Sequence, residues 1–172
     1  MPRLPLTKGD GDLLFDMSDG CFLTVRRSVC GGLNKFRQTK KTSKEAGGVL
    51  LGRILERTGN YIVDEITTPK RTDRRSRYSF YRSKAHHDIA LKRWKASGGE
   101  CLYIGLWHSH PESSPTPSGV DFNDWKKALK NGRYEGDSLF FLIVGTVEIG
   151  CWRGVYLGRG VPEFYPLKRI DI

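Results

Sequence analysis

Hydrophobic residues along the chain recur in short runs that are separated by polar, glycine-rich segments. Two runs, at residues 101–107 and 139–144, are almost continuously apolar, which is typical of strands covered on both faces. Residues 48–55 and 61–66 are strand-like on either side of a Thr-Gly-Asn turn, so they predict a hairpin. These patterns place a β-sheet at the centre of the fold.

Apolar residues at helical spacing predict helices between the strands. One helix is expected after Ser83, which can cap it, and the glycine pair at 98–99 ends it. Another, of about twelve residues, is expected after Ser118. A short helix is also expected within residues 27–40, beginning near Gly32. The residues expected to face the core are Ala85, Ile89, Ala90 and Trp94 in the helix after Ser83, and Val120, Trp125, Ala128 and Leu129 in the helix after Ser118.

The remaining segments complete a mixed α/β order. Residues 22–25, 78–81 and 147–152 are strand candidates, whereas residues 1–20 are expected to form an irregular arm or one short strand. Prolines predict an irregular tail at 155–172. The chain shows no internal repeat and no second domain, so we expect one α/β domain over the whole chain, with a single mixed β-sheet flanked by helices.

Composition excludes several classes of protein. The chain has 172 residues, of which 38% are hydrophobic and 28% charged, which is typical of a globular domain. No apolar run approaches the length of about 18 residues that a membrane span needs, and we expect the protein in the cytoplasm. The four cysteines form no C-x-x-C pair and are expected to be reduced. Cys101 is a candidate nucleophile, but no sequence feature marks it as one.

Metal-binding chemistry is indicated where the first of the two apolar runs ends. His108 and His110 are followed by Ser118 and Asp121 in the pattern H-x-H-x7-S-x-x-D. On an extended segment, residues two apart leave the same face, so both imidazoles can bind one ion. A loop rich in proline and serine can bring Asp121 back to the pair. Two histidines and one carboxylate favour Zn²⁺, one per chain, and leave a fourth position open, as in catalytic sites.

These residues also have simpler interpretations. His108 and His110 could be ordinary histidines of a loop, with Asp121 serving only as a helix cap, but the spacing is too specific to favour this. Ser118 could be only a helix cap. The other two histidines, His86 and His87, lie on a predicted surface helix and are expected to face solvent.

These motifs resemble the JAMM (JAB1/MPN/Mov34) metalloproteases, in which a glutamate precedes H-x-H-x7-S-x-x-D. Glu45 opens the segment Glu-Ala-Gly-Gly-Val-Leu-Leu-Gly, which is similar to the E-x-G-G-x-L-x-G strand of that family. The resemblance covers roughly residues 22–154 and shows no departure at a motif position. It implies a JAB1/MPN sandwich, which is related to the cytidine-deaminase fold.

The resemblance also implies a role for each motif residue. His108, His110 and Asp121 would be the zinc ligands. Glu45 would lie beside the zinc-bound water and act as general acid–base catalyst, and the Ser118 hydroxyl would stabilise the oxyanion. The reaction would be hydrolysis of a peptide or isopeptide bond after the C-terminus of ubiquitin or a ubiquitin-like protein, whose tail enters as an extended strand.

Among family branches, the His-Ser-His-Pro-Glu loop is most similar to prokaryotic deconjugating peptidases of type II CBASS anti-phage operons. There the partner is a CD-NTase whose C-terminus was conjugated by an E1–E2-like enzyme. Two other members of the fold are alternatives, namely a DNA-associated protein of the RadC type and a non-catalytic MPN scaffold. A zinc deaminase would need H-x-E and P-C-x-x-C, which this chain lacks.

The net charge of +10 bears on which kind of molecule the protein binds. Basic residues gather at 37–44, 70–77 and 126–130, and the second group lies in an expected charged loop. Such charge can bind nucleic acid or attract an acidic protein, and we favour the protein. We therefore expect the loop at 66–81, with Arg71, Arg74 and Arg75, to contact an acidic surface of the substrate.

Overall fold

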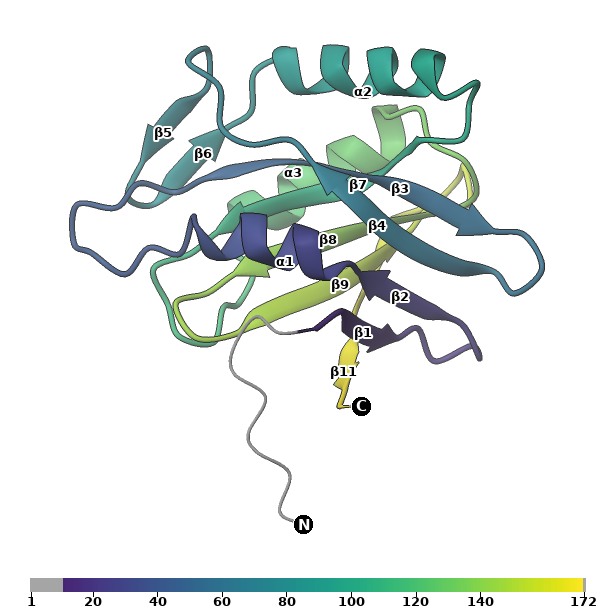
Figure 1. Ribbon diagram of the computed structural model, residues 1–172, viewed down its shortest axis with the longest axis horizontal. Coiled ribbons are helices and arrows are strands. Elements are labelled where there is room, and N and C mark those ends of the chain that lie inside the picture. The colour runs from purple at the N-terminus through teal and green to yellow at the C-terminus, as the bar shows by residue number, and fades with distance from the viewer. Residues whose placement is uncertain (1–10, 172) are drawn as a thin grey trace.

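A nine-stranded mixed sheet forms the centre of the structure, a computed structural model that describes residues 11–171 (Figure 1). The strands are β1 (Leu13–Asp16), β2 (Phe22–Val25), β3 (Gly47–Leu55), β4 (Asn60–Ile66), β5 (Arg74–Ser76), β6 (Ser79–Tyr81), β7 (Leu102–Ser109), β8 (Ser138–Val144), β9 (Ile149–Val155), β10 (Glu163–Pro166) and β11 (Lys168–Ile170). The helices are α1 (Arg27–Asn34), α2 (Ala85–Ala96) and α3 (Gly119–Asn131). The large sheet has the order β10-β9-β8-β7-β3-β4-β2-β1-β11, and β5 pairs only with β6.

Helices cover both faces of the large sheet, α1 on one side and α2 with α3 on the other (Figure 1). Each face has its own hydrophobic core. Leu33 of α1 packs in the first core with Phe140 of β8, whereas Trp125 of α3 packs in the second with Phe141. The Trp125 and Phe141 rings are stacked with centroids 4.5 Å apart. The predicted α/β class, with one mixed sheet between helices, is confirmed.

Strands β7 and β8 lie side by side at the centre, as the two apolar runs predict. All seven residues of β8 are buried, because alternate side chains enter opposite cores. The two strands are parallel and joined through α3, which crosses one face of the sheet. This βαβ unit brings the start of α3 to the carboxyl end of β7, where the histidine pair lies.

The structure corrects the expectation of an irregular tail at 155–172. Two short strands form there, β10 paired with β9 and β11 paired with β1. Each covers an edge of the sheet whose backbone groups would otherwise lack partners, and this pairing is why the tail becomes ordered. Part of the expected N-terminal arm, residues 1–10, lies outside the described residues, and the arm contributes β1 to the sheet.

The charged loop also departs from the expectation. Residues 69–77 contain β5, which forms a separate hairpin with β6. The strand expected at 78–81 therefore belongs to this hairpin and not to the large sheet. Arg75 lies opposite Phe80 in the register, and the hairpin projects beside the start of β3 (Figure 1).

Several helical positions differ from the predicted pattern. Trp94 and Val120 were expected to face the core but are 46% and 68% exposed. Helix α1 begins at Arg27 instead of near Gly32, because Val29 and Leu33 bury one face of it against the sheet despite the interrupting glycines. Within residues 11–171, no helix is long and apolar enough to span a membrane.

His86 is the clearest correction. It was expected to face solvent, yet it is completely buried at the start of α2. Its Nε2 lies 2.8 Å from an oxygen of Asp73, and its Nδ1 lies 2.6 Å from the Thr67 hydroxyl. The Thr67 oxygen also accepts from the Val49 N–H, so its own hydrogen is free to bind Nδ1, which favours a neutral His86. Sequence periodicity missed this histidine because its partners are distant in the chain.

The buried His86–Asp73 pair should make stability depend on pH. Burial lowers the pKa of His86, although the hydrogen bond to Asp73 opposes this effect. Below pH ~6.5 the unfolded histidine therefore binds a proton that the folded one does not, and stability falls with pH. We expect His86→Ala to lower the free energy of unfolding by roughly 2–4 kcal/mol at pH 7. The loss of unfolding free energy caused by His86→Ala should be smaller at pH 5.

Urea denaturation at both pH values measures the two free energies. His87→Ala is the matched control, since His87 is the next residue of the same helix and is exposed. It should cost less than about 1 kcal/mol at either pH. A difference between wild type and His86→Ala that stays constant or grows on acidification would contradict the neutral, buried state of His86.

Candidate metal centre

Two histidines meet at the carboxyl end of β7. His108 is the second-last residue of the strand and His110 follows its end, so both side chains leave the same face. Their Nε2 atoms lie 3.0 Å apart. Ser109 points to the opposite side and is completely buried. The spacing of one residue thus gives the geometry that the sequence predicts.

Asp121 joins the pair from the first turn of α3. Ser118 is the N-cap of this helix, and its hydroxyl accepts a hydrogen bond from the Asp121 N–H at 3.1 Å. The Asp121 carboxylate in turn accepts from the Ser118 N–H at 2.8 Å. This reciprocal capping box fixes the carboxylate, whose two oxygens lie 3.1 Å from Nε2 of His108 and 3.2 Å from Nε2 of His110.

The three groups have the spacing of metal ligands. Their contacting atoms lie between 3.0 and 3.2 Å from one another. A tetrahedral zinc ion with bonds of about 2.0–2.1 Å holds its ligand atoms roughly 3.3 Å apart, so the set fits such an ion with little rearrangement. Three protein ligands leave one position for water or substrate. These residues can therefore hold a catalytic metal.

Hydrogen bonds from the two histidines keep the Asp121 carboxylate ionised. Burial alone would raise the pKa of Asp121, but hydrogen bonds from His108 and His110 outweigh it and hold that pKa well below its ordinary value. Burial also lowers the pKa of His110, yet its hydrogen bonds to Asp121 and Glu112 raise it overall. The carboxylate is thus ionised and ready to bind a positive ion.

Glu112 is a functional candidate that the sequence reasoning missed. Its Oε1 lies 2.7 Å from Nδ1 of His110. A carboxylate that accepts from Nδ1–H leaves the Nε2 lone pair of the same ring free for a metal. The only sequence signal is an acidic residue two positions after the second histidine, which is too common a feature to single out.

Glu45 supplies a second carboxylate at the site. It lies two residues before β3 begins, and only 5% of it is exposed. Ligand-type atoms of Glu45, His108 and His110 all lie within 4.8 Å of one another. Asp121 contacts both imidazoles directly, so either carboxylate can complete a set of three ligands with the two histidines. Burial raises the pKa of Glu45 to about 8, with His110 opposing and Asp121 adding to the shift. A general base works best with a pKa near neutral pH.

Other candidate residues are less directly placed. Ser118 is exposed and acts as the helix cap, which leaves its role toward substrate a prediction. Burial raises the pKa of the Cys101 thiol, which does not favour a reactive thiolate there. The four cysteines are free.

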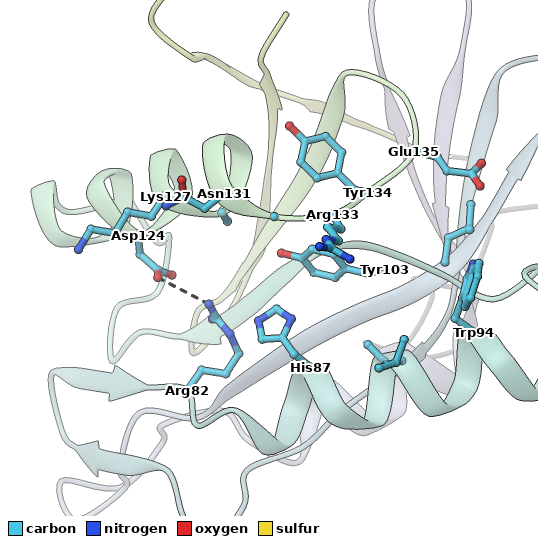
Figure 2. A pocket seen from close by; sticks show the side chains of 15 residues that line it. Arg82, His87, Trp94, Tyr103, Asp124, Lys127, Asn131, Arg133, Tyr134 and Glu135 are labelled. Carbon is cyan, nitrogen blue, oxygen red and sulfur yellow. Dashed lines mark ion pairs between the residues drawn. The ribbon is translucent and has the colours of Figure 1, made fainter. Parts of the chain in front are cut away.

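A separate groove of about 820 Å³ lies between α2 and α3 (Figure 2). His87 and Tyr103 point into it from α2 and β7, and Arg82 pairs with Asp124 at 3.6 Å along its border. Asp124 is three residues beyond Asp121 on α3. None of the five motif residues lines this groove.

Comparison with known proteins agrees with this geometry. Residues 36–155 match the family described as prokaryotic homologs of the JAB domain. The chain belongs to this family. The match includes all five motif residues and extends over most of the chain, so the predicted resemblance is confirmed.

Curated relatives point to one activity. A protein of Escherichia coli (strain TW11681) is 37% identical over 134 residues, which cover 77% of this chain and 80% of the relative. A protein of Vibrio cholerae is 32% identical over 147 residues, covering 84% and 88%. A third, from Pseudomonas aeruginosa, is 37% identical over 115 residues, covering 64% and 72%. Each is named a CD-NTase/cGAS isopeptidase. The predicted enzyme class, a hydrolase, is confirmed by these relatives.

A solved structure supports the fold. The solution structure of protein DSY2949 from Desulfitobacterium hafniense aligns with a TM-score of 0.55 over 83% of this chain and 89% of that one. The two are 21% identical, so this likeness shows the shared fold alone.

The raised pKa of Glu45 has a consequence for the metal-free protein. Unfolded, the side chain ionises near pH ~4.3, whereas folded it keeps its proton until about pH 8. Between these values the folded state binds more protons, so stability falls as pH rises. We expect wild type to lose stability relative to Glu45→Gln between pH 5 and 8, by roughly 1.4 kcal/mol per pH unit at the steepest point.

Urea denaturation in the presence of a chelator, at pH 5, 6.5 and 8, measures this slope. Glu56→Gln is a suitable control, because that carboxylate is exposed on the turn after β3 and its loss should leave the slope of wild type unchanged. If the free energies of unfolding of wild type and Glu45→Gln change in parallel with pH, Glu45 is not held protonated by burial.

Proposed function

We propose that this chain is a zinc-dependent isopeptidase that hydrolyses the bond after the C-terminus of a ubiquitin-like or otherwise conjugated protein. The observation that carries the proposal is the convergence of three side chains of ligand type, His108, His110 and Asp121, with a buried glutamate, Glu45, within 4.8 Å of the two histidines. The names of the curated relatives support the reaction class. The donor set of two imidazoles and one carboxylate supports zinc.

Each group has one role in the proposed reaction. A bound zinc ion would supply Lewis acidity, which polarises a carbonyl and makes water a stronger acid, with a pKa near ~7. A carboxylate oxygen of Glu45 takes the proton from the attacking water and later delivers it to the leaving amine. The Ser118 hydroxyl donates to the substrate oxygen as negative charge develops there. Glu112 holds the His110 ring in the tautomer that presents Nε2.

The proposed substrate is a CD-NTase joined through its C-terminus to another molecule by an E1–E2-like enzyme. This matches the names of the relatives from Escherichia coli and Vibrio cholerae. The chain would then release the CD-NTase from its conjugates in the cytoplasm of a bacterium, as part of anti-phage defence of the CBASS type. The scaffold alternative is disfavoured, because all five motif residues are present.

The β5–β6 hairpin provides the surface for an acidic part of the substrate. The one acidic residue of the segment 66–81 is Asp73, which precedes the hairpin and whose side chain is buried against His86, whereas Arg71 and Arg74 are exposed. Arg77 donates to the carbonyls of Lys40 and Lys41, which joins two basic segments far apart in the sequence. This segment is therefore cationic, and the hairpin hydrogen-bonds through Arg75 and Ser76 to the backbone of Glu45.

Cleavage of a fusion tests the proposed reaction. A CD-NTase is joined through its C-terminus to a reporter protein, and kcat, KM and zinc content are measured for each enzyme variant. Glu45→Gln should lower kcat by about 10²–10⁴-fold with zinc still near one per chain, since it loses the proton acceptor only. His110→Ala should lose both zinc and cleavage. Zinc binding without cleavage of this fusion or of an isopeptide-linked form would overturn the function.

Charge reversal tests the hairpin surface. Arg71→Glu with Arg74→Glu should raise KM about tenfold at low salt, because the reversed charges repel an acidic substrate surface. The value of kcat should be unchanged, because both side chains are exposed and lie outside the metal centre. Arg75 is left intact, since it bonds to the Glu45 backbone. Lys92→Glu with Lys95→Glu, on exposed positions of α2, is the matched control. Equal KM values and equal salt dependence for both pairs would remove the hairpin from substrate binding.

A further inference from the structure

A buried amide, Gln38, lies behind the metal centre and joins three segments of the chain. Only 2% of it is exposed. Its Oε1 accepts from the Ser109 hydroxyl at 2.8 Å. Its Nε2 donates to the carbonyl of Ser43 at 3.2 Å and to that of Arg77 at 2.9 Å. No motif includes this residue, and burial of an amide is costly unless such bonds are made.

The first of these bonds reaches the histidine pair. Ser109 lies between His108 and His110, and its N–H donates to the carbonyl of Ala46 at 2.9 Å. Its hydroxyl accepts a hydrogen bond from the Ala46 N–H at 2.9 Å and donates one to Oε1 of Gln38. Both backbone groups of Ala46 are thus hydrogen-bonded to Ser109, the residue between His108 and His110.

The other two bonds reach the chain on either side of Glu45. Ser43 lies two residues before Glu45, and Arg77 follows Ser76, whose carbonyl accepts from the Glu45 N–H at 2.7 Å. The Arg75 guanidinium donates from Nε to the Glu45 carbonyl at 2.8 Å. Both backbone groups of Glu45 are therefore held by the hairpin that Gln38 anchors.

We propose that Gln38 is a positioning residue, which sets Glu45 at its place relative to His108 and His110. It links the segment before Glu45, the hairpin that holds the Glu45 backbone, and the serine between the ligands. The inference rests on the proposed function for its catalytic consequence. Its structural part, the immobilisation of residues 45–46 against Ser109, can be measured without any substrate.

Gln38→Met tests the proposal, because methionine has a similar shape but makes none of the three hydrogen bonds. In the zinc-loaded full chain, kcat on the fusion substrate should fall about 10–100-fold with KM within twofold, the size expected when a catalytic group is slightly misplaced. Zinc content should stay near one per chain. Hydrogen exchange at the Ala46 amide should speed by at least about tenfold relative to amides of β8.

Ser109→Ala provides a second, milder variant in case Gln38→Met does not fold. It breaks the same chain of hydrogen bonds at its other end, so the double variant should fall no further than the worse single one. Thr42→Ala is the matched control, since it shortens an exposed side chain in the same loop and leaves the Ser43 carbonyl that Gln38 binds. It should leave kcat and Ala46 exchange unchanged.

The two readouts separate the possible failures. An unchanged kcat per zinc-loaded molecule in both single variants, with wild type cleaving, would overturn the positioning role. Unchanged exchange at Ala46 would overturn it equally, whatever the activity. If wild type cleaves nothing, the proposed function fails, and Ala46 exchange alone decides whether Gln38 immobilises the Glu45 segment.

Discussion

The pairing of the end of β7 with the start of β3 is the constraint on which the rest of the site depends. In this antiparallel register His108 lies opposite Gly47, and Ser109 makes two hydrogen bonds to Ala46. Glu45 precedes this contact by one residue, so the pairing brings its carboxylate to the histidines. The parallel pairing of β7 with β8 then brings the start of α3, with Asp121, to the same point.

Close packing explains why glycines follow Glu45. A Cβ atom at Gly47 would lie 2.6 Å from the Phe80 ring and 2.7 Å from the Trp107 carbonyl oxygen. At Gly48 it would lie 2.2 Å from the Thr67 carbonyl oxygen. These distances are too short for any side chain, so only residues without Cβ atoms let the strand approach β7, the hairpin and the segment after β4 this closely. The Gly-Gly pair of the motif is therefore a steric requirement of the site.

Local patterns predicted the parts of the fold that depend on nearby residues. The buried strand β8, the β3–β4 hairpin and the capped helix α3 all follow from periodicity and turn chemistry. Spacing along one strand likewise placed His108 beside His110. Long-range partners were missed, because hydrogen bonds such as those of His86 with Asp73 and of Gln38 with Ser109 leave no periodic signal. The tail strands β10 and β11 depend in the same way on distant sheet edges.

X-ray absorption at the zinc edge of the zinc-loaded protein tests the central claim most directly. We expect a first shell of four nitrogen and oxygen atoms at about 2.0 Å, with the outer-shell pattern of two imidazoles. The spectrum should be the same for Glu45→Gln, since the proposed role of Glu45 is that of a base beside the open position and not that of a ligand. A sulfur neighbour, fewer than two imidazoles, or a shell that changes in Glu45→Gln would contradict this arrangement of the site.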